Sequence, residues 1–111
     1  MRNEIEDLVK DNEICSNVHM LGVRTDIPQI MHCFDVFVFP SLYEGIPLVT
    51  IEAQAAGVPC VIASTVSRDV DINIGLVQFV DLQSNIDFWV NQILKKALKQ
   101  IDQIGLFDNL L

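Results

Sequence analysis

One stretch decides how this chain folds: FPSLYEGIPLVTIEAQAAGVP, at residues 39–59. A mostly apolar run that begins at residue 35 ends within this stretch in Pro-Ser, at residues 40–41. A short loop then leads into a run of apolar and small residues. Proline favours the first position of a helix and glycine commonly follows its end, so Pro47 and Gly57 predict the limits of that helix. We therefore expect a strand over residues 35–41, a loop over residues 42–46 and a helix up to Gly57.

The segments around this stretch alternate between helix and strand in the same way. Asp26, with Gln29 three residues later, predicts a short capped helix that reaches Phe34. Two stretches carry apolar side chains at helical spacing, residues 3–12 and residues 84–103. Three short apolar runs are typical of strands, residues 18–21, 59–63 and 76–80.

This order of elements predicts an α/β fold. Strands that are apolar on both faces belong to parallel sheets that helices cover, and sequential crossovers build such a sheet. Ligands of parallel sheets bind beyond the carboxyl ends of the strands. The loops after Leu21, Phe39 and Ala63 are therefore the candidate site.

The composition predicts one strongly acidic domain. The chain has 111 residues, and fifteen Asp and Glu against seven Lys and Arg give a formal net charge of −8. The basic residues are scattered, whereas a nucleic-acid backbone needs clustered positive charge, so we expect no nucleic-acid partner. No apolar stretch is long enough to span a bilayer, and the charge in residues 1–6 argues against a signal peptide, so we expect a cytoplasmic protein.

The cysteines and histidines form no metal-ligand pattern. No C-x-x-C pair is present, and His19 and His32 share no ligand spacing with the cysteines, so we expect no metal and no cofactor. Cys33 and Cys60 lie in apolar surroundings, which favours buried and inert thiols. Trp89, near the start of the last predicted helix, is expected in the core.

The loop and helix start within residues 39–59 predict an anion site made from backbone. The first free amides of the helix, at Leu48 and Val49, point beyond the strand end, which suits an acidic protein that binds phosphates. Glu44 lies in the loop near the mouth of this site. Glu52 lies among apolar and small residues, so we expect its carboxylate to be largely buried and to need donors such as ribose hydroxyls. From spacing alone, a ligand role and a role as plain solvated charges both stay open.

A resemblance favours the ligand role. Three features of residues 40–59 are similar to the signature of the retaining glycosyltransferases called group 1: Pro-Ser-x-x-Glu, the Glu-x7-Glu spacing of Glu44 and Glu52, and Ala-x-Ala-x-Gly-x-Pro. Residues 20–24, MLGVR, fall where that family has its Leu-Gly loop. The resemblance covers about residues 5–100 and is greatest to bacterial enzymes of capsular and exopolysaccharide biosynthesis. It implies the C-terminal half of the GT-B fold, a partial Rossmann-like parallel sheet flanked by helices.

The resemblance also implies a nucleotide-sugar donor, with a UDP-sugar expected, no metal, and a role for each matching position. Glu44 would be the catalytic residue, beside the anomeric carbon of the donor sugar, and Glu52 would bind the ribose hydroxyls. The other donor-binding positions are the backbone of Gly45 and Ile46 at the sugar, the amides of Leu48 and Val49 at the diphosphate, and the loop of Gly22 and Arg24 at the nucleobase.

The chain also departs from this family. A GT-B enzyme has two domains with the active site between them, and nothing here corresponds to the N-terminal domain, to the opening strand of the second domain, or to the Arg and Lys that hold the diphosphate. Arg68 is expected in solvent rather than in their place. We therefore expect residues 1–111 to be a single, truncated donor-binding domain that transfers no sugar alone. Its exposed sheet edge would favour self-association, and its place would be the cytoplasm or the inner membrane face.

Three other classes of protein stay open. A dinucleotide-binding domain shares the alternation of elements, but no G-x-G-x-x-G follows any predicted strand. A receiver-like domain would need clustered acids after its first strand and a late lysine, and neither is visible. A non-catalytic remnant would only pack against a partner, and nucleotide binding that depends on Glu52 would separate it from a donor-binding domain.

Overall fold

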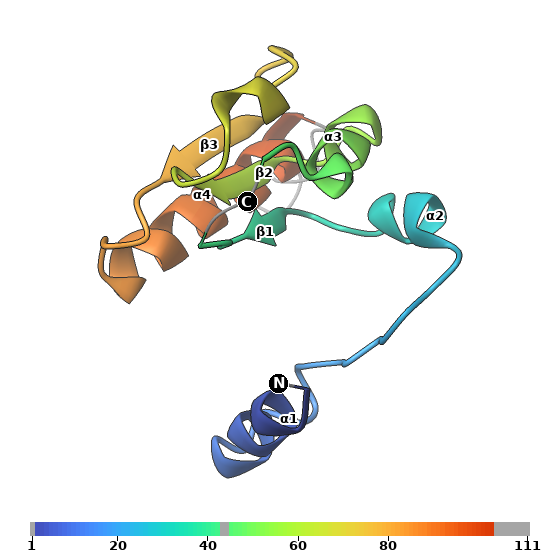
Figure 1. Ribbon diagram of the computed structural model, residues 1–111, viewed down its shortest axis with the longest axis vertical. Coiled ribbons are helices and arrows are strands. Elements are labelled where there is room, and N and C mark those ends of the chain that lie inside the picture. The colour runs from blue at the N-terminus through green and yellow to red at the C-terminus, as the bar shows by residue number, and fades with distance from the viewer. Residues whose placement is uncertain (1, 43–44, 104–111) are drawn as a thin grey trace.

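The computed structural model describes residues 2–42 and 45–103, and of residues 99–103 it describes the backbone alone. The strand and the helix expected on either side of the loop at residues 42–46 are both present, as β1 and α3 (Figure 1). The elements follow in the order α1 (Arg2–Asp11), α2 (Ile27–Met31), β1 (Phe37–Phe39), α3 (Leu48–Ala55), β2 (Cys60–Ala63), the 3-10 helix η1 (Arg68–Val70), β3 (Val77–Val80) and α4 (Ile86–Gln103).

The three strands form one parallel sheet in the order β1-β2-β3. Phe37 pairs with Cys60, and Cys60 in turn pairs with Val77, so the strands align from their first residues. The central strand β2 is buried along its whole length, as expected for a strand that is covered on both faces. The predicted α/β class with a parallel sheet is confirmed, and β1 is an edge strand within the described part of the chain.

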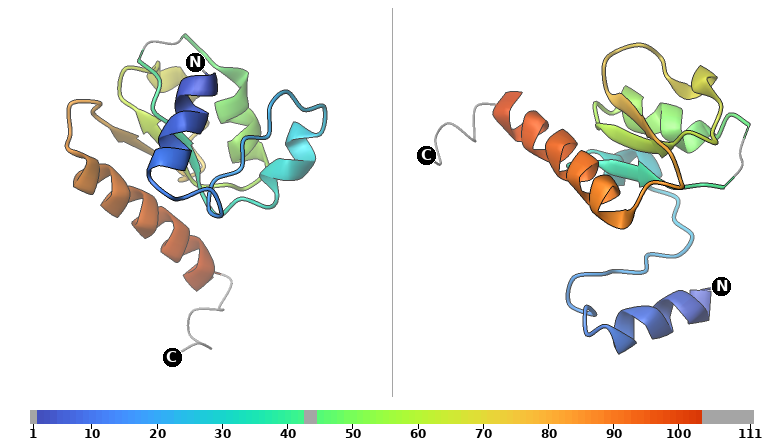
Figure 2. Two further views of the ribbon diagram at one scale, coloured as in Figure 1. Left: turned by 90° about the horizontal axis from the view of Figure 1, so that it is seen from below. Right: turned by 90° about the vertical axis from the view of Figure 1, so that its left-hand side faces the viewer.

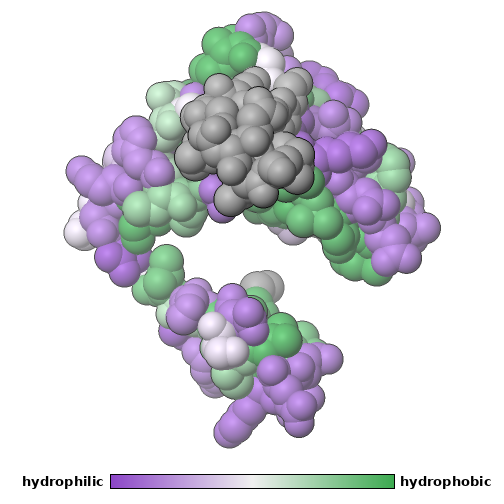
Figure 3. Space-filling view, turned by 180° about the vertical axis from the view of Figure 1, so that it is seen from behind, coloured by the Kyte–Doolittle hydropathy of each residue, from purple (hydrophilic) through white to green (hydrophobic). Residues whose placement is uncertain are grey.

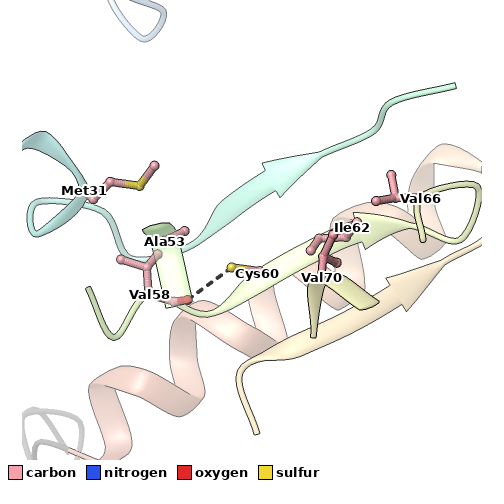
Figure 4. Packing of buried hydrophobic residues seen from close by; sticks show 7 residues of the cluster. All are labelled: Met31, Ala53, Val58, Cys60, Ile62, Val66 and Val70. Atoms are coloured by element: carbon pink, nitrogen blue, oxygen red, sulfur yellow. Dashed lines mark hydrogen bonds between the residues drawn. The ribbon is translucent and has the colours of Figure 1, made fainter. Parts of the chain in front are cut away.

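Alternate side chains of β2 build two cores on opposite faces of the sheet, one toward α3 and the other toward α4 (Figure 2). Cys60 and Ile62 belong to the α3 side, where they pack with Met31, Ala53, Val58, Val66 and Val70 (Figure 4). Val61 and Ala63 belong to the α4 side, where they pack with Val80 and Trp89. Trp89 is 7% exposed and its indole N–H donates to the Asp81 carbonyl at 3.1 Å, so its predicted place in the core is confirmed.

The two cysteines predicted in the core differ. Cys60 is fully buried, its thiol lies 3.3 Å from the Val58 carbonyl oxygen, and burial raises its pKa to about 11. Cys33 is exposed, so that prediction is wrong. The reason is that α2 ends before Cys33, which lies in the following turn with its amide bonded to the Ile30 carbonyl at 2.9 Å.

The first quarter of the chain departs from the predicted order. Helix α1 forms as expected, but none of its residues is buried and it does not pack on the sheet (Figure 1). Residues 18–21 were expected to be a strand and form none, and Leu21 is 51% exposed. A strand exists through backbone hydrogen bonds to a neighbour, and this segment runs apart from β1, β2 and β3. Its apolar residues therefore have no partner strand within the described chain.

The predicted cap of α2 is also wrong. Asp26 precedes the helix, but its side chain makes no capping hydrogen bond, and the helix ends at Met31 instead of reaching Phe34. The Asp26 carboxylate instead accepts two hydrogen bonds from the Arg24 guanidinium, both 2.7 Å long, and this partner lowers the pKa of the carboxyl. A charged fork of two donors binds a carboxylate more strongly than one backbone amide does.

Candidate functional site

Two of the three loops predicted to form the site meet beyond the carboxyl ends of the strands. The Thr65 hydroxyl donates to the Ser41 carbonyl oxygen at 2.6 Å, which ties the loop after β2 to the loop after β1. The amide of Ser64 donates to the Val80 carbonyl at 2.8 Å, so the end of β3 is held at the same edge. The loop after Leu21 does not join them, because residues 18–25 run away from the sheet (Figure 1).

Helix α3 begins at this edge with free amides. Pro47 is the cap residue, so the helix begins at Leu48, one residue later than predicted. The Pro47 carbonyl accepts both the amide of Thr50 at 3.1 Å and the Thr50 hydroxyl at 2.6 Å. The amides of Leu48 and Val49 occupy the first two helical positions, where helix geometry provides no acceptor. Leu48 is 69% exposed, so this helix start opens to solvent and can receive an anion.

Glu52 lies on the exposed face of α3, so the prediction of a buried carboxylate is wrong. The buried residues of this helix are Thr50, Ala53 and Gln54, and they face the core. The helical repeat of 3.6 residues places Glu52 on the other face, together with Leu48 one turn before it. An exposed carboxylate needs no internal donor, and its oxygens remain available to a ligand at the helix surface.

A shallow hollow of about 220 Å³ lies between α2 and α3, and Glu52 lines it. Helix α2 contributes Pro28, and His32 follows at its C-terminal end. Helix α3 contributes Glu52 and Ala55, and Ala56 follows at its end. Apart from the histidine and the carboxylate, the side chains of this hollow are small and apolar.

Gln54 is, like Thr50, a buried polar residue of α3, and sequence reasoning missed it. Its side-chain nitrogen donates to the carbonyls of Thr50 at 3.0 Å and Val70 at 2.7 Å, and its oxygen accepts the amide of Ile72 at 3.0 Å. Gln54 thereby fastens the segment after β2 to the helix. Glu52 was expected to be buried because it is a polar residue among apolar ones. The same argument applies to Gln54, and for Gln54 it would have been correct.

The remaining predicted site residues fall into two groups. Gly45 and Ile46 are exposed and lead directly into the start of α3, whereas Glu44 lies outside the described residues. Gly22 and Arg24 belong to the segment that runs apart from the sheet, and Arg24 lines a separate hollow with Leu21, Val23, Thr25 and Asp26. The structure therefore places the predicted diphosphate and ribose positions on α3, with Gly45 and Ile46 just before it, and does not bring the predicted nucleobase loop to them.

Arg68 is exposed, as predicted, and its side chain also makes a packing contact. Its guanidinium lies over the ring of Phe79 in β3, 4.1 Å from the ring centroid. Such a cation–π contact holds the side chain against the sheet. This contact gives Arg68 a packing role.

A larger apolar hollow lies on the opposite face of the sheet, between the β1 edge and the start of α4. Its volume is about 390 Å³, and its lining residues are Val38, Pro40, Leu82, Ser84, Ile86, Trp89, Val90 and Ile93. Further exposed apolar side chains of α4 extend this surface, among them Phe88, Leu94 and Leu98. Figure 3 shows hydrophobic surface along the α4 side of the molecule, on the right of the view and above the N-terminal helix.

Within residues 2–42 and 45–103, no three His, Cys, Asp or Glu side chains gather where they could hold a metal ion. In the same part of the chain, no helix is both long enough and apolar enough to cross a membrane.

Comparison with known proteins yields one family and several relatives. The family described as "Glycosyl transferases group 1" matches residues 1–100. The Bacillus subtilis (strain 168) protein EpsF, whose name describes it as a glycosyltransferase, is 43% identical over 94 residues, which are 85% of this chain and 24% of that protein. An Escherichia coli protein named UDP-Gal:alpha-D-GlcNAc-diphosphoundecaprenol alpha-1,3-galactosyltransferase is 34% identical over 77% of this chain and 22% of its own length.

A third relative, from Campylobacter jejuni, is named N,N'-diacetylbacillosaminyl-diphospho-undecaprenol alpha-1,3-N-acetylgalactosaminyltransferase. It is 44% identical over 46 residues, which are 41% of this chain and 12% of that protein. The chain thus spans about a quarter or less of the length of these curated relatives. No solved structure matches the chain significantly.

Proposed function

Because the chain belongs to the glycosyl transferases of group 1, we propose that it is the part of such an enzyme that holds the nucleotide-sugar donor. The reaction is a retaining glycosyl transfer in bacterial polysaccharide biosynthesis, including capsule, and the donor is a UDP-sugar. The E. coli relative, whose name includes UDP-Gal, supports this choice of nucleotide. The observation that carries the proposal is the open start of α3, with Glu52 one turn further along the same exposed face.

The proposed binding mode follows from the charges of the donor. The diphosphate lies at the amides of Leu48 and Val49, where the positive end of the helix dipole favours an anion. The carboxylate of Glu52 accepts hydrogen bonds from the ribose hydroxyls. The backbone of Gly45 and Ile46 lies beside the sugar, before the helix begins. This arrangement binds an anionic ligand on an acidic chain without requiring a metal or a basic patch.

The proposed chemistry follows from the charge that develops during transfer. Breaking the anomeric C–O bond places positive charge on the sugar and negative charge on the departing diphosphate. Amides already directed at the diphosphate stabilise that negative charge, and the loss of one such donor typically costs about 3 kcal/mol of barrier. Glu44, the proposed catalytic residue, is negative beside the sugar and stabilises the positive charge.

The whole enzyme contains more than this chain. The curated relatives are about three and a half times as long as this chain, and in the proposed arrangement an N-terminal GT-B domain supplies the other wall of the active site. We propose that residues 1–111 form one donor-binding domain of a cytoplasmic or peripheral enzyme and transfer no sugar by themselves. The β1 edge and the apolar α4 surface favour self-association when that other domain is absent.

Ligand-observed NMR of this chain with UDP and UDP-galactose tests the proposal. We expect saturation transfer to the ribose protons that weakens in Glu52→Ala and is unchanged in Glu4→Ala. Glu4 is a matched control because it is an exposed acid on α1, which does not pack on the sheet. The proposal would be contradicted if UDP bound the Glu52→Ala variant as strongly as the parent chain. It would also be contradicted if a chain whose spectrum shows it to be folded bound neither ligand. Either result would favour a non-catalytic remnant.

A further inference from the structure

The turn that follows β2 is fixed at both of its ends. Ala63 and Val66 are both buried, and the Val66 amide donates to the Ala63 carbonyl at 3.0 Å. Between them, the Ser64 amide donates to the carbonyl of Val80, the last residue of β3, at 2.8 Å. The backbone of Thr65 is therefore held by the core and by the neighbouring strand, although the Thr65 side chain is exposed.

The Thr65 hydroxyl binds a backbone that comes from a distant part of the sequence. It donates to the Ser41 carbonyl oxygen at 2.6 Å, and the two residues are 24 positions apart. This distance is at the short end of the range for hydroxyl donors. The ladder between β1 and β2 ends at Phe39 and Ile62, and Pro40 has no amide hydrogen with which to continue it. The Thr65 hydroxyl thus attaches the chain at a point two residues beyond the end of the ladder.

The backbone held in this way is the start of the short connection from β1 to α3. The last two residues of this connection before the cap residue Pro47 are Gly45 and Ile46. At this far end a second threonine makes the same kind of bond, because the Thr50 hydroxyl donates to the Pro47 carbonyl at 2.6 Å. The bond of Thr50 spans three residues at one helix start, whereas the bond of Thr65 depends on the packing of β2 beside β1.

We propose that Thr65 is a positioning residue of the donor site and that it holds in place the backbone that faces the donor sugar. The proposed function places that sugar beside the backbone of Gly45 and Ile46, and the present inference rests on that placement. A short connection that is fixed at both ends has few conformations, so a ligand that binds its backbone loses little conformational freedom. Without the Thr65 hydroxyl, the end at Ser41 is released, and the sugar must order this backbone at a cost in free energy.

The same geometry limits the effect to the sugar part of the ligand. The proposed diphosphate and ribose positions are the amides of Leu48 and Val49 and the carboxylate of Glu52, and all of them belong to α3. This helix is held against the core by its own buried residues, including Gln54, and not by the Thr65 hydroxyl. Loss of that hydroxyl should therefore weaken the contact to the sugar and leave the contact to the ribose unchanged.

Saturation-transfer NMR with UDP-galactose measures both parts of the ligand at once. Saturation of the galactose protons reports the contact to the sugar, and saturation of the ribose protons in the same molecule is the internal reference. Thr65→Val removes the hydroxyl and keeps the shape of the side chain, whereas Thr65→Ser keeps the hydroxyl. Thr25→Val makes the same change at an exposed threonine in the segment that runs apart from the sheet. Because both threonines are exposed, each variant should fold, and backbone amide spectra check this.

We expect Thr65→Val to lower the saturation of galactose relative to ribose. The variant should also bind UDP-galactose about two- to tenfold more weakly, the usual effect of one hydrogen bond, while its affinity for UDP stays unchanged. Thr65→Ser should restore the ratio of galactose to ribose saturation and the affinity, and Thr25→Val should behave as the parent chain does. A hydroxyl that only supports the fold would instead weaken UDP and UDP-galactose equally.

The possible results separate this inference from the proposed function. If ribose saturation depends on Glu52 while Thr65→Val leaves the galactose-to-ribose ratio unchanged, the inference is wrong and the donor site stands. An equal loss of both signals in Thr65→Val would also refute the inference, as would a parent chain that saturates the ribose but not the galactose. If ribose saturation is the same in Glu52→Ala as in the parent chain, or is absent from both, the proposed function and this inference both fail.

Discussion

The side chain of Gln54 offers the sharpest test of how the site is held together. It is 1% exposed and connects α3 to the segment after β2 through the Val70 carbonyl and the Ile72 amide. In Gln54→Ala, the buried Val70 carbonyl loses this side-chain donor, and a buried group without a partner costs about 1–3 kcal/mol. The amide of Ile72 lies nearer to solvent and regains water, while the lost side chain leaves a cavity that adds to the cost.

We therefore expect Gln54→Ala to lower the free energy of unfolding by about 2–4 kcal/mol, a large fraction of the roughly 5–15 kcal/mol that holds a typical domain. Gln54→Met fills a similar volume without the hydrogen bonds, so it isolates the polar part, about 1–3 kcal/mol. Gln83→Ala changes an exposed glutamine and should stay within about 0.5 kcal/mol of the parent chain.

Urea unfolding followed by tryptophan fluorescence measures these differences. Trp89 is the only tryptophan and is buried on the α4 side of the sheet, so its emission reports the loss of the core. If Gln54→Ala and Gln54→Met both unfold within about 0.5 kcal/mol of the parent chain, the hydrogen bonds of Gln54 do not hold the segment after β2. The reasoning would then be refuted even though the geometry is present.

Three further predictions use the same unfolding assay or a simple chemical probe. Glu52→Ala should weaken nucleotide binding yet leave the urea midpoint within error, because its carboxylate is exposed, and a marked loss of stability would assign Glu52 a structural role. Trp89→Phe removes the hydrogen bond to the Asp81 carbonyl and should cost about 0.5–1.5 kcal/mol, measured by circular dichroism, and no loss would mean that this bond contributes nothing. Burial raises the pKa of the Cys60 thiol from 9.0 to about 11, so its contribution to stability is complete below pH 9 and declines as the pH rises toward 11. The parent chain should therefore lose more stability between pH 8.5 and pH 10.5 than Cys60→Ala, and equal losses would refute this.

Residues 35–59 were sufficient to predict the strand, the helix and the end of that helix. The helix ends just before Gly57, which has a φ of 79°, a conformation that glycine adopts without strain. The family followed from the same stretch, because its spacing of Glu, Ala, Gly and Pro is itself the signature. The roles of the individual site residues remain predictions that the proposed binding experiments address.

The errors arise where the contacts that a segment makes in the fold override the pattern of its own sequence. The run at residues 18–21 is apolar enough for a strand, but strand formation needs a neighbouring backbone, and sequence alone does not name that neighbour. Asp26 satisfies the pattern of a helix cap, but a guanidinium two residues away competes better for its oxygens. Cys33 was assigned to the core because its surroundings in the sequence are apolar, but α2 ends before it and leaves it exposed.

The local sequence thus determined which segments from β1 to α4 are helices or strands, because helix and strand propensity and turn chemistry depend on a few neighbouring residues. It also determined the family, because the spacing of the signature residues lies within one short stretch. Tertiary structure decided which polar side chain of α3 is buried. Glu52 and Gln54 are both polar residues in an apolar helix, and only the direction of the sheet places Gln54 inside and Glu52 at the surface. Tertiary structure also placed His32 beside Glu52, because packing α2 against α3 joins residues twenty positions apart into one hollow.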